Sequence, residues 1–301
     1  LESFDEPFAD SSALPTYIVA RETARSVKVA LSGDGGDELF AGYRMYAGER
    51  WASLYSRIPG TLRRHLIEPL AASLPDSRES LLTDYARRLK KFVRGAGQPF
   101  ERRFLAWNEI FERAAREELL QQRPGVFADL GEVILRERLG EREDDAVNRM
   151  LWADVKESLP GDMLKKVDQM SMLNSLEVRV PFLDRRVCEL AFSISGARKL
   201  RNGKGKVILR ETFRDLLPPV LRNRPKWGFE MPVAAWLRNG LGGLIDETLG
   251  PERIRRQGIF DARAVARIVG DFRSGRRDTS WQLWNLIAFQ VWHETYMEGR
   301  L

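Results

Sequence analysis

Apolar and polar positions alternate over a short stretch near the N-terminus. In "SVKVALS", residues 26–32, Val27, Val29 and Leu31 stand at every second position, which is the period of a half-buried strand. The preceding "SSALPTYIVARETAR", residues 11–25, is typical of a helix that begins after a serine and tolerates a proline in its first turn. A helix, a strand and then a glycine-rich turn predict an α/β fold.

Beyond Gly42 the apolar positions recur with the period of a helix. The segments expected to be helical are 45–58, 80–121, 143–175, 182–195, 205–217, 231–249 and 278–298. The chain shows no internal repeat and no long low-complexity linker. The pattern therefore predicts one domain over residues 1–301, with an α/β portion at 1–44 and a mainly helical portion at 45–301.

The composition fits a globular chain with a buried core, since 43% of the 301 residues are hydrophobic and 31% are charged. No apolar run reaches the roughly 18 residues of a membrane span, and the acidic start "LESFDEPFAD" is unlike a signal peptide. One cysteine and two histidines exclude a disulfide framework and Cys/His zinc sites. We therefore expect a cytoplasmic protein without a membrane partner.

The net charge is +6, from 49 basic and 43 acidic residues, and such an excess can indicate a nucleic-acid or phosphate partner. Here the basic residues alternate with acidic ones in helical segments, and no basic block is interleaved with regularly spaced aromatic residues. The arrangement is typical of a solvated, arginine-rich surface. We predict no nucleic-acid partner.

The most unusual segment is "SGDGGDELFAGY", residues 32–43, where Asp34, Asp37 and Glu38 lie among three glycines at the end of the predicted strand. It matches neither a dinucleotide-binding motif, nor a phosphate-binding P-loop, nor a calcium-binding EF-hand loop. Carboxylates repel phosphate unless Mg²⁺ bridges them to it, so the turn suits a magnesium-pyrophosphate site or acid/base chemistry. The alternative is an aspartate that only caps the following helix.

Two further segments carry charged residues in unusual settings. In "LPGDMLKKVDQMSMLNSLEVRVPFLDRR", residues 159–186, an amphipathic helix leads into a stretch where Glu177 and Arg179 alternate with valines. In "RNRPKWGFEMP", residues 222–232, Lys226 lies in a loop between proline and aromatic residues. A lysine in such a loop can follow negative charge that develops on a reacting centre.

These segments together resemble the C-terminal synthetase domain of the glutamine-hydrolysing asparagine synthetases, from "DEPFADSSALP" to "WQLWNLIAFQVW". "KVILRETF" and "RPKWGF" are similar to landmarks of that family and occur in the same order. The resemblance implies an α/β fold with a partial Rossmann-like parallel sheet of the adenine nucleotide alpha-hydrolase type, followed by a mainly helical region. It also implies ATP-dependent amidation of aspartate through aspartyl-AMP.

The same resemblance implies roles for the acidic turn. Ser32 and Gly33 would contact ATP, and Asp34 would act as a catalytic acid near the aspartyl-AMP intermediate. Asp37 would hold Mg²⁺-pyrophosphate, and Glu38 would contact the substrate. ATP and Mg²⁺ are the cofactors that we expect.

Four other residues have roles implied by the family. Lys226 matches a lysine that stabilises negative charge during adenylation and amide formation, and Asp168 would orient it. The alternative for Asp168 is a surface pair with Lys165 on its own helix. Glu177 and Arg179 would line the substrate pocket or, alternatively, pair only with each other.

The chain also departs from the family pattern. The ATP-gripping loop Ser-Gly-Gly-x-Asp-Ser and the glutaminase domain with its N-terminal cysteine are missing from the sequence, which reads as a fragment. We expect an open strand edge in the sheet and no activity from the 301 residues alone. The expected partners are aspartate or a related carboxylate, the glutaminase domain of a parent chain and, as an open alternative, a second copy in a homodimer.

Two other functions remain open at this point. A sibling adenylating ligase would activate another carboxylate by the same chemistry. A binding fragment without catalysis is the alternative from a different class.

Overall fold

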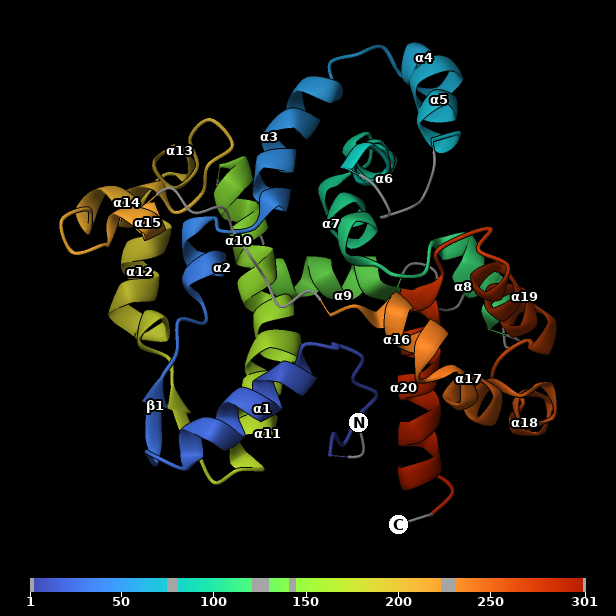
Figure 1. The fold of residues 1–301 in the computed structure, drawn as a ribbon. Coiled ribbons are helices and arrows are strands. Elements are labelled where there is room, and N and C mark those ends of the chain that lie inside the picture. The colour runs from blue at the N-terminus through green and yellow to red at the C-terminus, as the bar shows by residue number, and fades with distance from the viewer. Residues whose placement is uncertain (1–2, 75–80, 121–129, 141–144, 223–230, 300–301) are drawn as a thin grey trace.

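A computed structural model of the protein describes residues 3–74, 81–120, 130–140, 145–222 and 231–299. The described chain is mostly helical and contains one small parallel sheet (Figure 1). The predicted α/β class with a helical remainder is therefore confirmed in its coarse form, whereas two strands do not define a Rossmann-like sheet.

The sheet consists of β1 (Val29–Leu31) and β2 (Glu177–Arg179), with Val29 opposite Glu177 and Leu31 opposite Arg179. Helix α1 (Ala13–Ala24) precedes β1 and packs against α11 (Lys165–Met172), which precedes β2. The two strands are parallel, so the chain must travel through a long connection between them, as every parallel pair requires. The turn that follows β1 and the segment that follows β2 consequently lie at the same end of the sheet, the carboxyl end of both strands.

The first helix and the first strand confirm the predictions made from the sequence pattern. Helix α1 begins after Ser12 and contains the proline in its first turn, and β1 is shorter than the expected strand. Ser12 makes no side-chain cap. Instead, Oδ1 of Asp10 accepts a hydrogen bond from the backbone N–H of Ser12 at 2.9 Å.

The first helical core surrounds Tyr46, Met150 and Leu151, which are all fully buried. Its main helices are α3 (Arg44–Tyr55), α6 (Leu81–Ala96), α7 (Phe100–Asn108), α9 (Leu130–Leu139) and α10 (Ala146–Lys156). Shorter elements around it are α4 (Gly60–Leu62), η1 (Arg63–Ile67), α5 (Glu68–Ala72), η2 (Leu159–Leu164) and α13 (Gly196–Lys199).

The second helical core surrounds Ile254, Leu283 and Ile287. It is built by α8 (Arg113–Leu119), α16 (Val233–Asn239), α17 (Gly242–Leu249), α18 (Pro251–Gln257), α19 (Ala262–Arg273) and α20 (Ser280–Tyr296). A smaller apolar cluster joins α2 (Gly36–Phe40), η3 (Pro181–Leu183), α12 (Arg185–Ser193) and α14 (Val207–Thr212), and α15 (Pro219–Arg222) follows.

The helical segment expected at 80–121 is divided into α6, α7 and α8. Pro99 stands directly before α7, and Glu109 has an extended backbone directly after it. A proline fixes a non-helical entry of this kind and cannot continue a preceding helix. The helices at 60–72, at 130–139 and at 251–273 were not predicted, because their apolar positions are few or interrupted by charged residues.

The apolar face of the small sheet is open in the described part of the chain. Val27 is 44%, Val29 41% and Leu31 72% exposed, although their alternation is typical of a covered strand. The expectation of an open strand edge concerns backbone pairing and stays a prediction. No helix among the described residues is long and apolar enough to cross a membrane.

A substitution at Gly35 tests how tightly the turn after β1 packs against Leu183. Its φ is +79°, and a Cβ there would lie 2.5 Å from Cδ2 of Leu183. Gly35→Ala should therefore lower the free energy of unfolding by roughly 1–3 kcal/mol, measured by urea denaturation. Gly33→Ala is the control, because a Cβ at Gly33 meets no atom within 4 Å. Equal stability of the two variants would contradict the packing described here.

Candidate active site

The candidate site begins at the turn between β1 and α2. The backbone N–H of Ser32 donates to the carbonyl of Arg179 at 2.9 Å, which continues the pairing with β2 by one residue. The hydroxyl of Ser32 donates to Oδ2 of Asp34 at 2.7 Å. The N-cap residue of α2 is Gly35, and no side chain caps this helix. The alternative that an aspartate of the turn caps α2 is therefore wrong.

The segment that follows β2 packs directly on this turn. Leu183 lies against Gly35, and a Cβ at Gly36 would lie 3.2 Å from the ring of Phe182. The glycines in the acidic turn therefore admit the side chains of "VPFLD". Two of the segments singled out in the sequence, far apart along the chain, thus meet at one end of the sheet.

A third segment approaches from "GKGKVILRE". Nζ of Lys206 lies 2.9 Å from Oδ1 of Asp37, and the backbone N–H of Lys206 donates to the carbonyl of Phe40 at 2.8 Å. A Cβ at Gly42 would overlap with this ion pair, since it would lie 1.6 Å from Oδ1 of Asp37. Gly42 is thus required by the pair, and Lys206 is a site residue that the sequence reasoning missed.

Behind the turn lies a buried network of carboxyl groups and tyrosines. Glu38 is 2% exposed and accepts a hydrogen bond from the hydroxyl of Tyr43 at 2.7 Å. The hydroxyl of Tyr46 donates to Oδ2 of Asp154 at 2.6 Å, and Ser158 donates to Oδ1 of Asp154 at 2.7 Å. Burial, and then the neighbouring carboxylates, raise the pKa of both tyrosines, so both remain protonated donors.

Burial also raises the pKa of Asp154, to about 6, and the charge of Glu38 adds to this despite the two hydrogen bonds that Asp154 accepts. Partial burial, and then the charge of Asp10, raise the pKa of Asp162 to about 7 although Lys166 lowers it, and Glu38 adds to the rise. Glu38 acts on both groups, which places the three carboxyls in one electrostatic neighbourhood. Carboxyl groups outnumber the cations in this neighbourhood, and burial together with this excess is the reason that two of their pKa values are raised.

Lys166 is the buried cation of this neighbourhood. It is 6% exposed, and its Nζ lies 2.5 Å from Oδ2 of Asp10. Lys166 and the hydrogen bonds from Ser12 outweigh burial and lower the pKa of Asp10. Asp162 and Lys166 stand four residues apart in "LPGDMLKKVDQM", a spacing that puts two side chains on one helix face and is the sequence signal that could have indicated them.

The donor set fits one magnesium ligand from the protein. Mg²⁺ commonly takes one or two carboxylates and completes its shell with phosphate oxygens and water. Asp37 offers such a carboxylate beside the turn, and its ion pair with Lys206 shows that a cation already neutralises it in the folded chain. No group of three or more acidic, histidine or cysteine side chains in the described residues could hold a metal alone.

The other predicted site residues lie outside this neighbourhood or outside the described residues. Nε of Arg179 lies 2.7 Å from Oε1 of Glu177, and both side chains are exposed, so they do pair with each other. Asp168 is exposed on α11. Lys165, its alternative partner, instead forms ion pairs with Asp5 and Glu6. The loop with Lys226 lies outside the described residues, so its predicted role stays a prediction.

The fold and the site together define an α/β protein with a polar centre at the carboxyl end of a parallel strand pair. The chain belongs to the asparagine synthase family, whose model matches residues 1–294. The resemblance stated from the motifs is thereby confirmed.

Curated relatives match nearly the whole chain. Asparagine synthetase [glutamine-hydrolyzing] 1 of Bacillus subtilis is 31% identical over 299 residues, which cover 99% of this chain and 45% of that protein. A putative asparagine synthetase [glutamine-hydrolyzing] of Mycobacterium tuberculosis is 33% identical over 299 residues, covering 98% of this chain and 43% of that protein. The chain thus spans less than half the length of these relatives.

The half-buried acid Asp162 makes a pH-dependent contribution to stability. Its pKa is higher in the folded protein than in the unfolded chain, so its stabilising effect is complete at low pH and is lost as pH rises through about 7. Asp162→Asn keeps a neutral side chain at every pH. The free energy of unfolding of the variant should exceed that of the natural protein by roughly 1–3 kcal/mol at pH 8 and should differ little from it at pH 4. Urea unfolding at both pH values measures this difference.

Asp168→Asn is the matched control, because Asp168 is exposed and lies in the next helix. It should change stability equally at both pH values. If Asp162→Asn behaved in the same way as this control, the buried acid network described above would be refuted.

Proposed function

We propose that the chain is the synthetase part of an asparagine synthetase. The carboxylate oxygen of the aspartate side chain would attack the α-phosphate of ATP to give aspartyl-AMP and release pyrophosphate. Ammonia would then attack the acyl carbon to give asparagine and release AMP. One observation carries the proposal. The acidic turn, "VPFLD" and Lys206 meet at the carboxyl end of the two parallel strands. Open α/β sheets bind their ligands at this end.

The start of the turn is suited to ATP. A Cβ at Gly33 would meet no atom within 4 Å, so the backbone there is open to a ligand. The hydroxyl of Ser32 is held by Asp34, which fixes its oxygen beside that open backbone. We assign ATP contacts to Ser32 and Gly33, and we assign to Asp34 the role of a catalytic acid that orients groups around the acyl-adenylate.

We assign the ion pair of Asp37 and Lys206 to the part of the site that would bind the pyrophosphate group of ATP. Mg²⁺, when bound, would neutralise charge on the phosphate oxygens. Asp37 would hold the ion, and Nζ of Lys206 would be free to turn from Asp37 toward the same phosphates. Before the nucleotide binds, the ammonium group of Lys206 neutralises the negative charge of the Asp37 carboxylate.

The buried acids suit the substrate side of the site. Glu38 is held by Tyr43, and the excess of carboxyl groups around it favours a ligand that brings positive charge, such as the ammonium group of an amino acid. We assign substrate contacts to Glu38 and retain Glu177 and Arg179 as proposed substrate residues. We also retain Lys226 as the lysine that stabilises developing negative charge, with Asp168 as its proposed orienting partner.

The source of ammonia is proposed from the relatives. Both bacterial synthetases are named as glutamine-hydrolysing, and each is more than twice as long as the segment matched here. We propose that a glutaminase domain of a longer parent chain supplies ammonia. Another part of that parent would cover the exposed face at Val29 and Leu31.

A second function is favoured by one finding. Amidase chyE of Penicillium rubens is 23% identical over 289 residues, covering 87% of this chain, and its name differs from those of the bacterial relatives. The relatives thus include a protein whose name is not that of an asparagine synthetase, and the second candidate is a ligase that adenylates a different carboxylate. The choice between the two rests on the substrate.

The proposed function is tested on the full-length protein with ATP, Mg²⁺ and either ammonia or glutamine. Aspartate should give equal amounts of asparagine and AMP, measured by chromatography. Glutamate, β-alanine and N-acetyl-aspartate serve as alternative carboxylates. AMP formation with one of these but not with aspartate would replace the proposal by the sibling ligase, and no AMP with aspartate would refute the proposed asparagine synthesis.

Lys226 is tested by its effect on turnover rather than on binding. Lys226→Ala should lower kcat by roughly 10²-fold or more and change KM little, because the charge that it stabilises develops only in the transition state. Lys226→Arg should not restore the rate, since a planar guanidinium is a poor substitute for a compact ammonium. Lys204→Ala is the control at an exposed lysine. Normal turnover with a lowered melting temperature would assign Lys226 a purely structural role.

A further inference from the structure

A cavity of about 870 Å³ lies where the two helical cores meet. Its walls come from α6, the loop at 108–112, α8, α19 and the start of α20. None of these elements carries a residue of the candidate active site, and Figure 1 shows them on the opposite side of α10 from β1 and α2. The volume lies within the range of about 300–1,000 Å³ that is usual for small-molecule sites.

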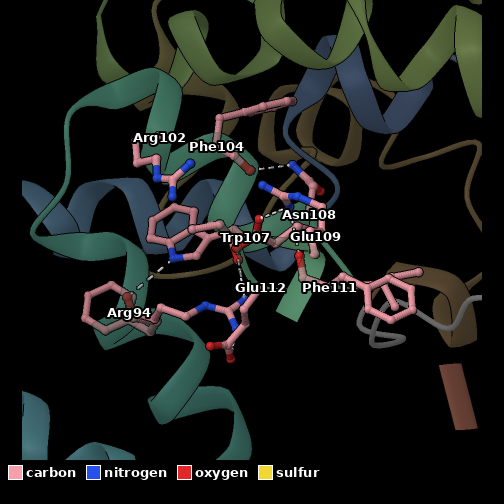
Figure 2. Close-up of polar contacts among 12 residues, drawn as sticks. Arg94, Arg102, Phe104, Trp107, Asn108, Glu109, Phe111 and Glu112 are labelled. Carbon is pink, nitrogen blue, oxygen red and sulfur yellow. Dashed lines mark hydrogen bonds and ion pairs between the residues drawn. The ribbon is translucent and has the colours of Figure 1, made fainter. Parts of the chain in front are cut away.

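One wall of the cavity is fixed by a polar network (Figure 2). Arg94 donates to the carbonyl of Ala106 at 2.7 Å and forms an ion pair with Glu112. Trp107 donates from its indole N–H to the carbonyl of Phe92 at 3.3 Å. These contacts tie both α7 and the segment after it to α6, so this wall of the cavity is held in place.

The interior of the cavity is partly apolar. Phe111, Ala114 and Ala115 line it from the side of α8, and Ile268 and Trp281 line it from the second core. Trp281 offers an indole ring on which a planar group can lie. The cavity therefore provides an apolar surface for a flat ligand.

The acidic groups that line the cavity are already engaged. Glu109 pairs with Arg116, Glu112 with Arg94, and Glu118 with Arg267. Asp271 pairs with Arg276, and Asp278 accepts hydrogen bonds from the backbone and hydroxyl of Ser280.

Some of the cations that line the cavity have unused donors. Within the described residues, the side chains of Lys90 and Arg277 form no ion pair or hydrogen bond. Arg94, by contrast, is engaged with Ala106 and Glu112 and belongs to the wall. The free cations that the cavity offers to a ligand are therefore Lys90 on α6 and Arg277 after α19, two separate segments around a partly apolar interior.

We propose that this cavity binds a small anionic ligand with a planar apolar body. Its negative group would lie between Lys90 and Arg277, and its planar part would lie over Phe111 and Trp281. The proposal does not depend on the proposed function, because the cavity shares no residue with the candidate active site.

The test uses two dyes of nearly the same shape on the full-length protein. 1-Anilinonaphthalene-8-sulfonate is anionic, and N-phenyl-1-naphthylamine is its uncharged counterpart. The double variant Lys90→Glu/Arg277→Glu should weaken binding of the anionic dye by about tenfold or more, because both free cations become repulsive. Binding of the uncharged dye should stay within about twofold, because the apolar interior is unchanged. Dye fluorescence titrations measure both affinities.

The control is Arg198→Glu/Arg214→Glu, which changes net charge equally at two exposed arginines on distant elements. It should leave the affinity for the anionic dye within about twofold of the natural protein. Equal weakening by both double variants would show a general charge effect and overturn the proposal. So would unchanged binding of the anionic dye in Lys90→Glu/Arg277→Glu, or an equal loss of both dyes.

Discussion

The parallel pairing of β1 with β2 is the constraint on which the candidate site depends. It joins Val29 to Glu177 across most of the first half of the chain and continues through the hydrogen bond from Ser32 to Arg179. Because both strands run in the same direction, the acidic turn and "VPFLD" leave the sheet at one end. Gly35 then allows the close contact with Leu183 that fixes the turn. Without this register, the turn would lose its contact with Phe182 and Leu183 of "VPFLD".

The buried charges behind the turn oppose folding and favour function. Glu38, Asp154 and Asp162 lie in one poorly solvated neighbourhood, and two of them have raised pKa values as a result. Lys166 balances only part of this charge through Asp10. An apolar replacement of such a network is often at least as stable, so a cluster of this kind is better explained by what it binds than by what it stabilises.

The sequence predicted the features that depend on neighbouring residues. The start of α1, the strand at Val29–Leu31 and the helical character beyond Gly42 follow from local periodicity and were confirmed. Strand β2 was not predicted, although the alternation of Glu177 and Arg179 was visible, because three residues become a strand only when a distant partner supplies the hydrogen bonds.

The candidate site shows the same division between local and distant information. The acidic turn could be recognised from its composition, whereas Lys206 could not, because its ion pair with Asp37 depends on a contact across the fold. Lys166 likewise meets Asp10 only after α11 packs beside the N-terminal segment. In both cases a lysine from a later segment neutralises an acid from the first. The polar centre is therefore complete only where the helical portion lies against the first 44 residues, and these two ion pairs join the two portions.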